Sequence, residues 1–341
     1  MKKVIFLFAM VLAVNMAMAQ TNVADIVQYG SNIAVIEQTG DLNEGIITQG
    51  AVGSPVTNKG ANLGGDWKYG SFITQKGTDN TAEVDVNTSS NGTSIDQLGN
   101  SNWAKQTLGA SISKTTNWNR MGLDINQEGN NNIANQETRS SFGTHGVQGM
   151  MINQEGNFNI ADQMSIGGAQ QQVEIEQIGN NNNNSVKSGK LFDVSATGLT
   201  NPVALPWAHK PAGDFTQYMY ENKGVTHMYV KGDDNNTYQF QEYDVWSISG
   251  QNDALMDVIG SRNNVAQGQL GDLNESEIDI EGNDNVVTTS QFGDSNIAKI
   301  ELLAGSNNCV AGIEQIGNLN DADILQSGVN NFAKVIQQPL P

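Results

Sequence analysis

The stretch that decides the fold is Ile313-Glu314-Gln315-Ile316-Gly317-Asn318-Leu319-Asn320-Asp321-Ala322-Asp323-Ile324-Leu325-Gln326. Alternation places Ile313 and Gln315 on one face of a strand, with Glu314 on the other. Gly317 opens a turn, because glycine permits the positive φ that a tight reversal needs. After the turn, one face carries Asn320, Ala322, Ile324 and Gln326. The stretch therefore predicts two short strands joined by a turn, with one apolar and carboxamide face and one acidic face.

The unit Gln-x-Gly-x-x-Asn recurs along the chain and is intact ten times. The leading glutamines are Gln38, Gln75, Gln97, Gln127, Gln154, Gln177, Gln269, Gln291, Gln315 and Gln326. The matching asparagines are Asn43, Asn80, Asn102, Asn132, Asn159, Asn182, Asn274, Asn296, Asn320 and Asn331. Four more copies replace the glutamine with Val230, Val258, Ile280 or Leu303. In the last third the units begin at 258, 269, 280, 291, 303, 315, 326 and 337, so each step is 11 or 12 residues.

This spacing predicts an all-β fold, a β-solenoid of the cross-β kind with two strands per coil of about 22 residues. Stacked coils would bring identical positions to about 4.7–4.8 Å from each other, glutamine on glutamine and asparagine on asparagine. Carboxamides suit such ladders because each carries both donors and an acceptor. A disordered low-complexity chain would lack the period-two alternation.

Composition excludes several functional classes. The chain has 341 residues, with 17 Lys+Arg against 36 Asp+Glu, a net charge of -19. A nucleic-acid partner is excluded because phosphate neutralisation needs a basic surface. One cysteine rules out a disulfide framework and a thiolate-rich metal site. The 43 Asn and 27 Gln, about one residue in five, supply the material for carboxamide ladders.

The N-terminus has the three parts of a secretory signal peptide. Lys2 and Lys3 precede an apolar run, and Ala17-Met18-Ala19 supplies the small residues of a cleavage site before Gln20. The apolar run is shorter than the roughly 20 residues of a spanning helix, which disfavours a membrane anchor. We expect residues 1–19 to be removed and the mature protein to be exported, with no later membrane span.

The pattern Gln315-x-Gly317-x-x-Asn320-x-Ala322-x-x-x-Gln326 resembles the curlin repeat of curli fibre subunits. Gln291–Ala298, Gln97–Ala104, Gln127–Ala134 and Gln154–Ala161 match its first half. The resemblance implies a bacterial subunit that is exported through the outer membrane and polymerises with itself into extracellular amyloid fibres of the biofilm. It also implies secretion and nucleation factors as partners.

The repeats divide the mature chain into three parts. Residues 20–186 hold repeats with short interruptions, and residues 248–341 hold the most regular ones. Between them, the segment 187–247 carries ten of the aromatic residues and a proline cluster at Pro202, Pro206 and Pro211. Proline cannot donate to a strand ladder, so 201–211 reads as a loop leaving the solenoid. Either the aromatics of this segment are buried against one sheet, or they form a recognition surface for a glycan or a protein.

The chain offers few residues for catalysis or cofactor binding. Its three histidines are far apart without a metal-ligand spacing, and no nucleophile elbow or phosphate loop occurs. We therefore expect no catalytic site and no cofactor. Cys309 follows Asn308 and should point outward as an ordinary thiol. The acidic residues Asp272, Glu275, Glu277, Asp279, Glu281 and Asp284 would form either a repulsive solvated face or a row that binds calcium.

The sequence supports one function and leaves two alternatives. The favoured function is a structural subunit that assembles end to end into extracellular fibres and supports surface adhesion. The first alternative is a cell-surface adhesin that does not polymerise and binds a glycan or protein through 187–247. The second is a solenoid that binds ice or mineral, which the lack of regular outward threonine rows disfavours.

Overall fold

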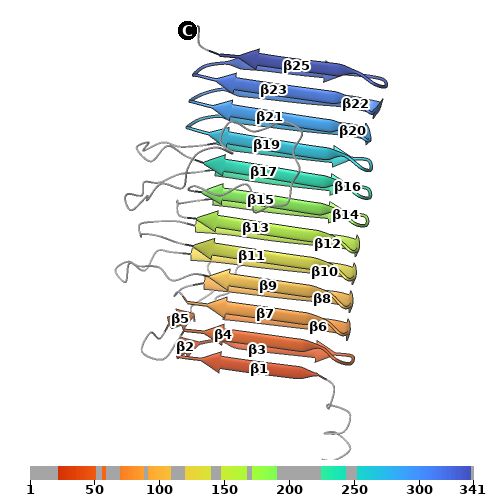
Figure 1. Cartoon of the computed structure of the whole chain (residues 1–341). Coiled ribbons are helices and arrows are strands. Elements are labelled where there is room, and N and C mark those ends of the chain that lie inside the picture. The colour runs from red at the N-terminus through yellow and green to blue at the C-terminus, as the bar shows by residue number, and fades with distance from the viewer. Residues whose placement is uncertain are drawn as a thin grey trace, which may run out of the picture.

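Figure 1 shows the protein as a column of stacked strands, with the C-terminus at one end. The computed structural model describes residues 22–50, 56–58, 70–87, 91–108, 120–139, 147–166, 171–189, 224–242 and 252–338. The predicted signal peptide, 1–19, lies outside these residues. Among the residues described there is no helix long and apolar enough to span a membrane.

Two long sheets make up the column. The 12-stranded sheet contains, in order, β1 (Val23–Gln28), β4 (Glu44–Gln49), β7 (Thr81–Val86), β9 (Trp103–Leu108), β11 (Ile133–Arg139), β13 (Ile160–Ile166), β15 (Asn183–Gly189), β17 (Asn236–Glu242), β19 (Asn264–Leu270), β21 (Val286–Phe292), β23 (Val310–Ile316) and β25 (Phe332–Gln337). The 11-stranded sheet contains β3 (Ala34–Thr39), β6 (Gly70–Thr78), β8 (Asn91–Asn100), β10 (Arg120–Asn130), β12 (Val147–Asn157), β14 (Gln171–Ile178), β16 (Gly224–Lys231), β18 (Asp253–Ile259), β20 (Glu275–Asn283), β22 (Ile297–Asn307) and β24 (Asp321–Gln326). A small separate sheet pairs β2 (Gly30–Asn32) with β5 (Val56–Asn58).

The chain alternates between the two long sheets, and every pair of neighbouring strands is parallel, with an unbroken register except at a bulge between β20 and β22. Gln75 lies opposite Gln97, for example, and Gln269 lies opposite Gln291, each 22 residues further along the chain. Two 11-residue units therefore form one coil. The all-β solenoid predicted from the repeat is confirmed.

The core is a thin layer between the two sheets. Strand β7 shows the alternation that builds it, because Ala82, Val84 and Val86 are buried while the residues between them are partly exposed. The 11-stranded sheet stacks isoleucines at its centre, and the opposite sheet contributes alanines. The isoleucines of the first half are Ile73, Ile95, Ile125, Ile152 and Ile175. Small residues facing branched ones let the sheets approach closely with few large side chains.

The turn between the sheets depends on glycine. Gly99 has φ +127°, and a Cβ placed on it would lie 1.8 Å from the carbonyl oxygen of Gly129 in the next coil. Two residues later Ser101 adopts φ +54°, completing the reversal. The lack of a side chain at Gly99 therefore has two effects: it permits the turn, and it lets the turn pack closely against that of the next coil.

Part of the predicted insertion belongs to the solenoid. Strands β16 and β17, which cover 224–231 and 236–242, pair in register with β14 and β15 on one side and with β18 and β19 on the other. The boundary drawn at 187–247 therefore included one complete coil. The proline cluster at 202–211 lies outside the described residues.

Candidate functional site: carboxamide ladders and open sheet ends

The first six predicted glutamines form a hydrogen-bonded ladder on the inner face of the 11-stranded sheet. From Gln38 to Gln177, the Nε2 of each glutamine donates to the Oε1 of the next at 2.7–2.9 Å. The second Nε2 hydrogen reaches a backbone carbonyl, as when Gln127 donates to Trp103 at 3.1 Å. A buried carboxamide is expensive unless it is paired. When identical glutamines stack, each carboxamide hydrogen-bonds to the next, so the buried side chains are paired.

This ladder stops at Gln177, and a second one begins in the other sheet. Val230, Val258, Ile280 and Leu302 continue the column of the first ladder as an apolar stack. In the 12-stranded sheet, Gln241, Gln269, Gln291, Gln315 and Gln337 form a ladder with Nε2–Oε1 distances of 2.8–3.0 Å. Gln326 stacks on Leu302 instead of a glutamine, and its buried Oε1 has no partner among the described residues.

The predicted asparagines lie in the turns. Asn43, Asn80, Asn102, Asn132, Asn159 and Asn182 share one turn column. Within it, the backbone N–H of Asn102 donates to the Oδ1 of Asn80 at 3.0 Å, and its Nδ2 donates to the Gly129 carbonyl at 2.9 Å. Each asparagine thus satisfies backbone groups in neighbouring coils, which binds the turns together as well as the strands.

A second turn column, on the opposite edge, holds three of the four remaining predicted asparagines. Asn274, Asn296 and Asn320 stack there, with Asn296 N–H donating to the Oδ1 of Asn274 at 3.0 Å and Asn320 repeating this contact. Asn252 precedes them in the same column. Asn331 lies on the first edge, where its Nδ2 donates to the Ser327 carbonyl at 2.7 Å. The predicted residues therefore form separate columns, not one.

Two predictions near residue 305 were wrong for the same reason. The register between β20 and β22 shifts by a bulge, so Leu302 stacks on Ile280 and Leu303 is 38% exposed. Leu303 is thus not the leading residue of its unit. The shift also moves Cys309 into the asparagine position, where it is fully buried and its N–H donates to the Oδ1 of Asn285 at 2.9 Å. The predicted outward thiol is an inward one.

Further ladder residues were missed by the motif search. Gln106 donates to Gln136 and Gln136 to Gln163, both at 2.9 Å, in the 12-stranded sheet. Gln239 donates to Gln267 at 2.8 Å in the same column. The signal was present: in the first three the glutamine follows an alanine by two positions, extending the motif to Asn-x-Ala-x-Gln.

The predicted acidic row is not a continuous site. Glu275, Glu277, Asp279 and Glu281 alternate along the outer face of β20, but Glu277 pairs with Lys299 at 3.1 Å. Burial raises the pKa of the Asp279 carboxyl, and its register neighbours Asp257 and Glu301 raise it further. Across the described ranges no three His, Cys, Asp or Glu side chains lie close enough together to hold a metal ion.

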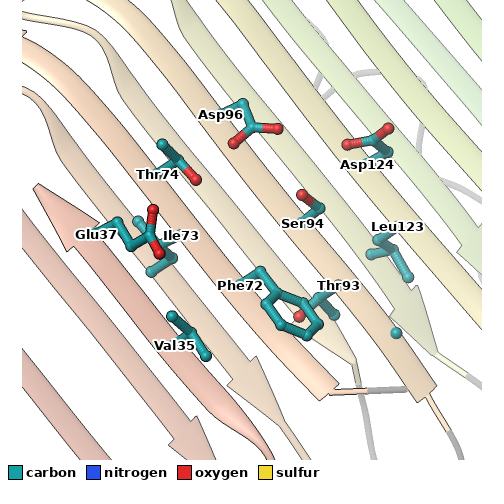
Figure 2. Close-up of a pocket in the computed structure, with 11 residues that line it drawn as sticks. Val35, Glu37, Phe72, Ile73, Thr74, Thr93, Ser94, Asp96, Leu123 and Asp124 are labelled. Atoms are coloured by element: carbon teal, nitrogen blue, oxygen red, sulfur yellow. The ribbon is translucent and has the colours of Figure 1, made fainter. Parts of the chain in front are cut away.

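A cavity of about 320 Å³ lies over β3, β6, β8 and β10. Figure 2 shows Phe72 and Val35 on one side, with the carboxylates of Glu37, Asp96 and Asp124 around the remainder. Burial raises the pKa of Asp124 to about 6, and the neighbouring charge of Asp96 adds to the shift. An ionised Asp124 is therefore costly to the fold at neutral pH.

Two aromatics of the 187–247 segment are buried on the outer face of the 12-stranded sheet, outside the core between the sheets. Tyr238 and Phe240 on β17 are each 1% exposed although they lie on alternate positions to the inward Gln239. Burial raises the pKa of Tyr238 well above its usual range. Tyr229, on β16, is also described. The other seven aromatics named by the sequence prediction lie outside the described residues.

Both ends of the solenoid present open strand edges. At the N-terminal end these are β1 and β3, and at the C-terminal end they are β24 and β25 (Figure 1). Ile26 and Ile336 are exposed by 42% and 51% there. Edge strands carry unpaired backbone N–H and C=O groups, which are a template for pairing with another chain.

Comparison with known proteins adds no relative. No family model matches the chain, and no curated protein matches it. The interpretation of function therefore depends on the residues and the fold.

Proposed function

We propose that the protein is a secreted structural subunit that polymerises end to end into extracellular fibres. The observation that carries the proposal is the pair of open ends, where parallel strands and carboxamide ladders stop without a cap among the described residues. A second copy can continue both, because each coil repeats the chemistry of the one before. This function is structural and requires no cofactor.

The remaining parts of the proposal follow from the sequence. The pattern in residues 1–19 supports export, and the curlin-like repeats support a bacterial cell-surface fibre with outer-membrane secretion and nucleation factors as partners. The acidic outer surface supports solubility before assembly, since like charges oppose lateral association. Adhesion to surfaces would be a property of the fibre.

Electron microscopy and fibre diffraction of the purified chain without residues 1–19 test the proposal. We expect unbranched fibres with a meridional reflection near about 4.7–4.8 Å. A protein that stays monomeric for days, with or without seeds, would refute polymerisation. That result would favour the adhesin, which a binding assay on a chain lacking 190–223 would then examine.

A further inference from the structure

The first and last strands carry the same sequence pattern. Residues 22–28 read Asn-Val-Ala-Asp-Ile-Val-Gln, and residues 331–337 read Asn-Phe-Ala-Lys-Val-Ile-Gln. Both strands belong to the 12-stranded sheet, and they occupy its two edges. The inward positions therefore match one to one: an asparagine at the turn, then alanine, a branched residue and glutamine.

The contacts of β1 are those that the last strand could make in its place. Gln28 Nε2 donates to the Oε1 of Gln49 at 2.8 Å, and the Oδ1 of Asn22 accepts the backbone N–H of Asn43 at 2.9 Å. Gln337 has the same side chain as Gln28, and Asn331 the same as Asn22. A β25 strand placed on β4 would thus reproduce both bonds.

The number of strands distinguishes two ways of joining copies. The described strands alternate between the two long sheets, and the first and last of them, β1 and β25, both belong to the 12-stranded sheet. Strand β24 contacts both β23 and β25, so the coils rise in half-steps from one sheet to the other. If β25 stacked directly on β1 of a second copy, the 11-stranded sheet would have an empty strand position between β24 and β3. If β25 took the position of β1, then β24 would pair with β3 and both sheets would continue unbroken.

We propose a strand exchange between copies: when two copies join, the β25 of one displaces the β1 of the other and pairs with its β4. This inference rests on the proposed function and specifies its interface. In the free subunit β1 occupies the position on β4 that β25 of another copy would take, so this mode of assembly requires that β1 be released.

The exchange is favoured because β1, although paired with β4 along its whole length, buries little apolar surface. Ile26 is 42% exposed although it lies on the inward face, and Ala24 is exposed as well. The bonds lost by β1 are replaced in kind by those of β25. The newly formed pairing of β24 with β3 is a net gain, and it covers the partly buried Ala34 and Ile36.

Locking β1 in place tests the proposal. Asp25 and Ile46 are opposite in register on β1 and β4, and a parallel pair at this spacing can be bridged by a disulfide. In a Cys309→Ser background, Asp25→Cys with Ile46→Cys should prevent seeded growth when oxidised and restore it when reduced. The matched control is Glu83→Cys with Lys105→Cys, an interior register pair, which should grow in both states.

Cross-linking between copies identifies the strand that β25 contacts. By its motif, Lys334 corresponds to Asp25, so the exchange places Lys334 opposite Ile46 of the next copy. Fibres mixed from Lys334→Cys and Ile46→Cys chains should form intermolecular disulfides. Direct stacking would instead link Lys334→Cys to Asp25→Cys chains, where the native residues are also oppositely charged.

The outcomes separate the two claims. Fibres that link Lys334→Cys to Ile46→Cys, and that the oxidised lock stops, support the exchange. The exchange is refuted if Lys334→Cys links to Asp25→Cys or to neither partner, or if the oxidised lock does not stop growth. In each of these cases the proposal of fibre formation still holds. If unmodified subunits form no fibres, the proposed function fails and the inference fails with it.

Discussion

Replacing one ladder glutamine should destabilise the solenoid although the replacement is more hydrophobic. Gln291→Leu removes the acceptor of Gln269 and the donor of Gln315, both at 3.0 Å, and the bond to the Glu275 carbonyl at 2.8 Å. The Gln269 Nε2 then keeps only its bond to the Asp253 carbonyl, and the Gln315 Oε1 loses its donor, at about 1–3 kcal/mol each, or about 2–6 kcal/mol together. The greater apolar area of leucine offsets up to about 2 kcal/mol. Taking this offset in full, we expect a net loss of up to about 4 kcal/mol.

Gln326→Leu is the matched control. Gln326 is 6% exposed, and its neighbour in the column is Leu302, so the change extends an apolar stack. It also removes the orphaned Oε1 and loses only one long bond, 3.3 Å to the Val310 carbonyl. The stability of this variant should be unchanged or higher. Denaturant unfolding of dilute monomer, followed by circular dichroism, compares the two. Equal stabilities would show that the ladders contribute nothing beyond burial.

Three further changes probe the turn, the asparagine column and the buried acid. Gly99→Ala should cost about 2–6 kcal/mol, since the added Cβ meets the Gly129 carbonyl at 1.8 Å and φ is +127°; unfolding at wild-type denaturant concentration would contradict the stacked turn. Cys309→Asn should restore the asparagine column, which stabilises the folded protein by about 0.5–1.5 kcal/mol and raises its thermal midpoint. Asn285→Cys should lower the midpoint. The pKa of Asp124 is raised from 3.8 to about 6, so the folded state holds a proton that the unfolded state has lost, and stability falls as pH rises between these values. Asp124→Asn should therefore stabilise the protein at pH 7, by up to about 3 kcal/mol, and have little effect near pH 3.5; urea midpoints that change equally at both pH values would contradict the raised pKa.

The sequence predicts the solenoid architecture, but it does not predict which repeat residues stack in the same column. Eleven-residue steps and period-two alternation predict which face of Ile313–Gln326 is buried, and Ile313, Gln315, Ala322 and Ile324 are buried as expected. The steps do not say which units share a sheet. The sheet of each unit depends on the two-unit coil and on how the chain passes through the interruptions. The sequence therefore did not predict that one glutamine ladder ends at Gln177 and another begins at Gln241 in the other sheet.

Local irregularity explains the other differences. The coil around Leu303 has two extra residues, one in each of two spacings of 12, and they can be absorbed in the turns or as a bulge in the strand. The structure has the bulge, which reverses the orientation of Cys309. The raised pKa of Asp124 was likewise out of reach, because it depends on residues from separate coils that pack around one carboxyl.

The direction of the glutamine ladders has a consequence for symmetry. In every ladder the Nε2 donates toward the C-terminal end, so Oε1 atoms lie on the N-terminal side, as in Gln38 and Gln28. Two N-terminal ends would bring acceptor against acceptor, and two C-terminal ends donor against donor. An isologous contact, in which the same patch meets itself, is therefore poorly matched. A heterologous contact repeated along the axis does not close on itself, so it generates an open filament in place of a dimer.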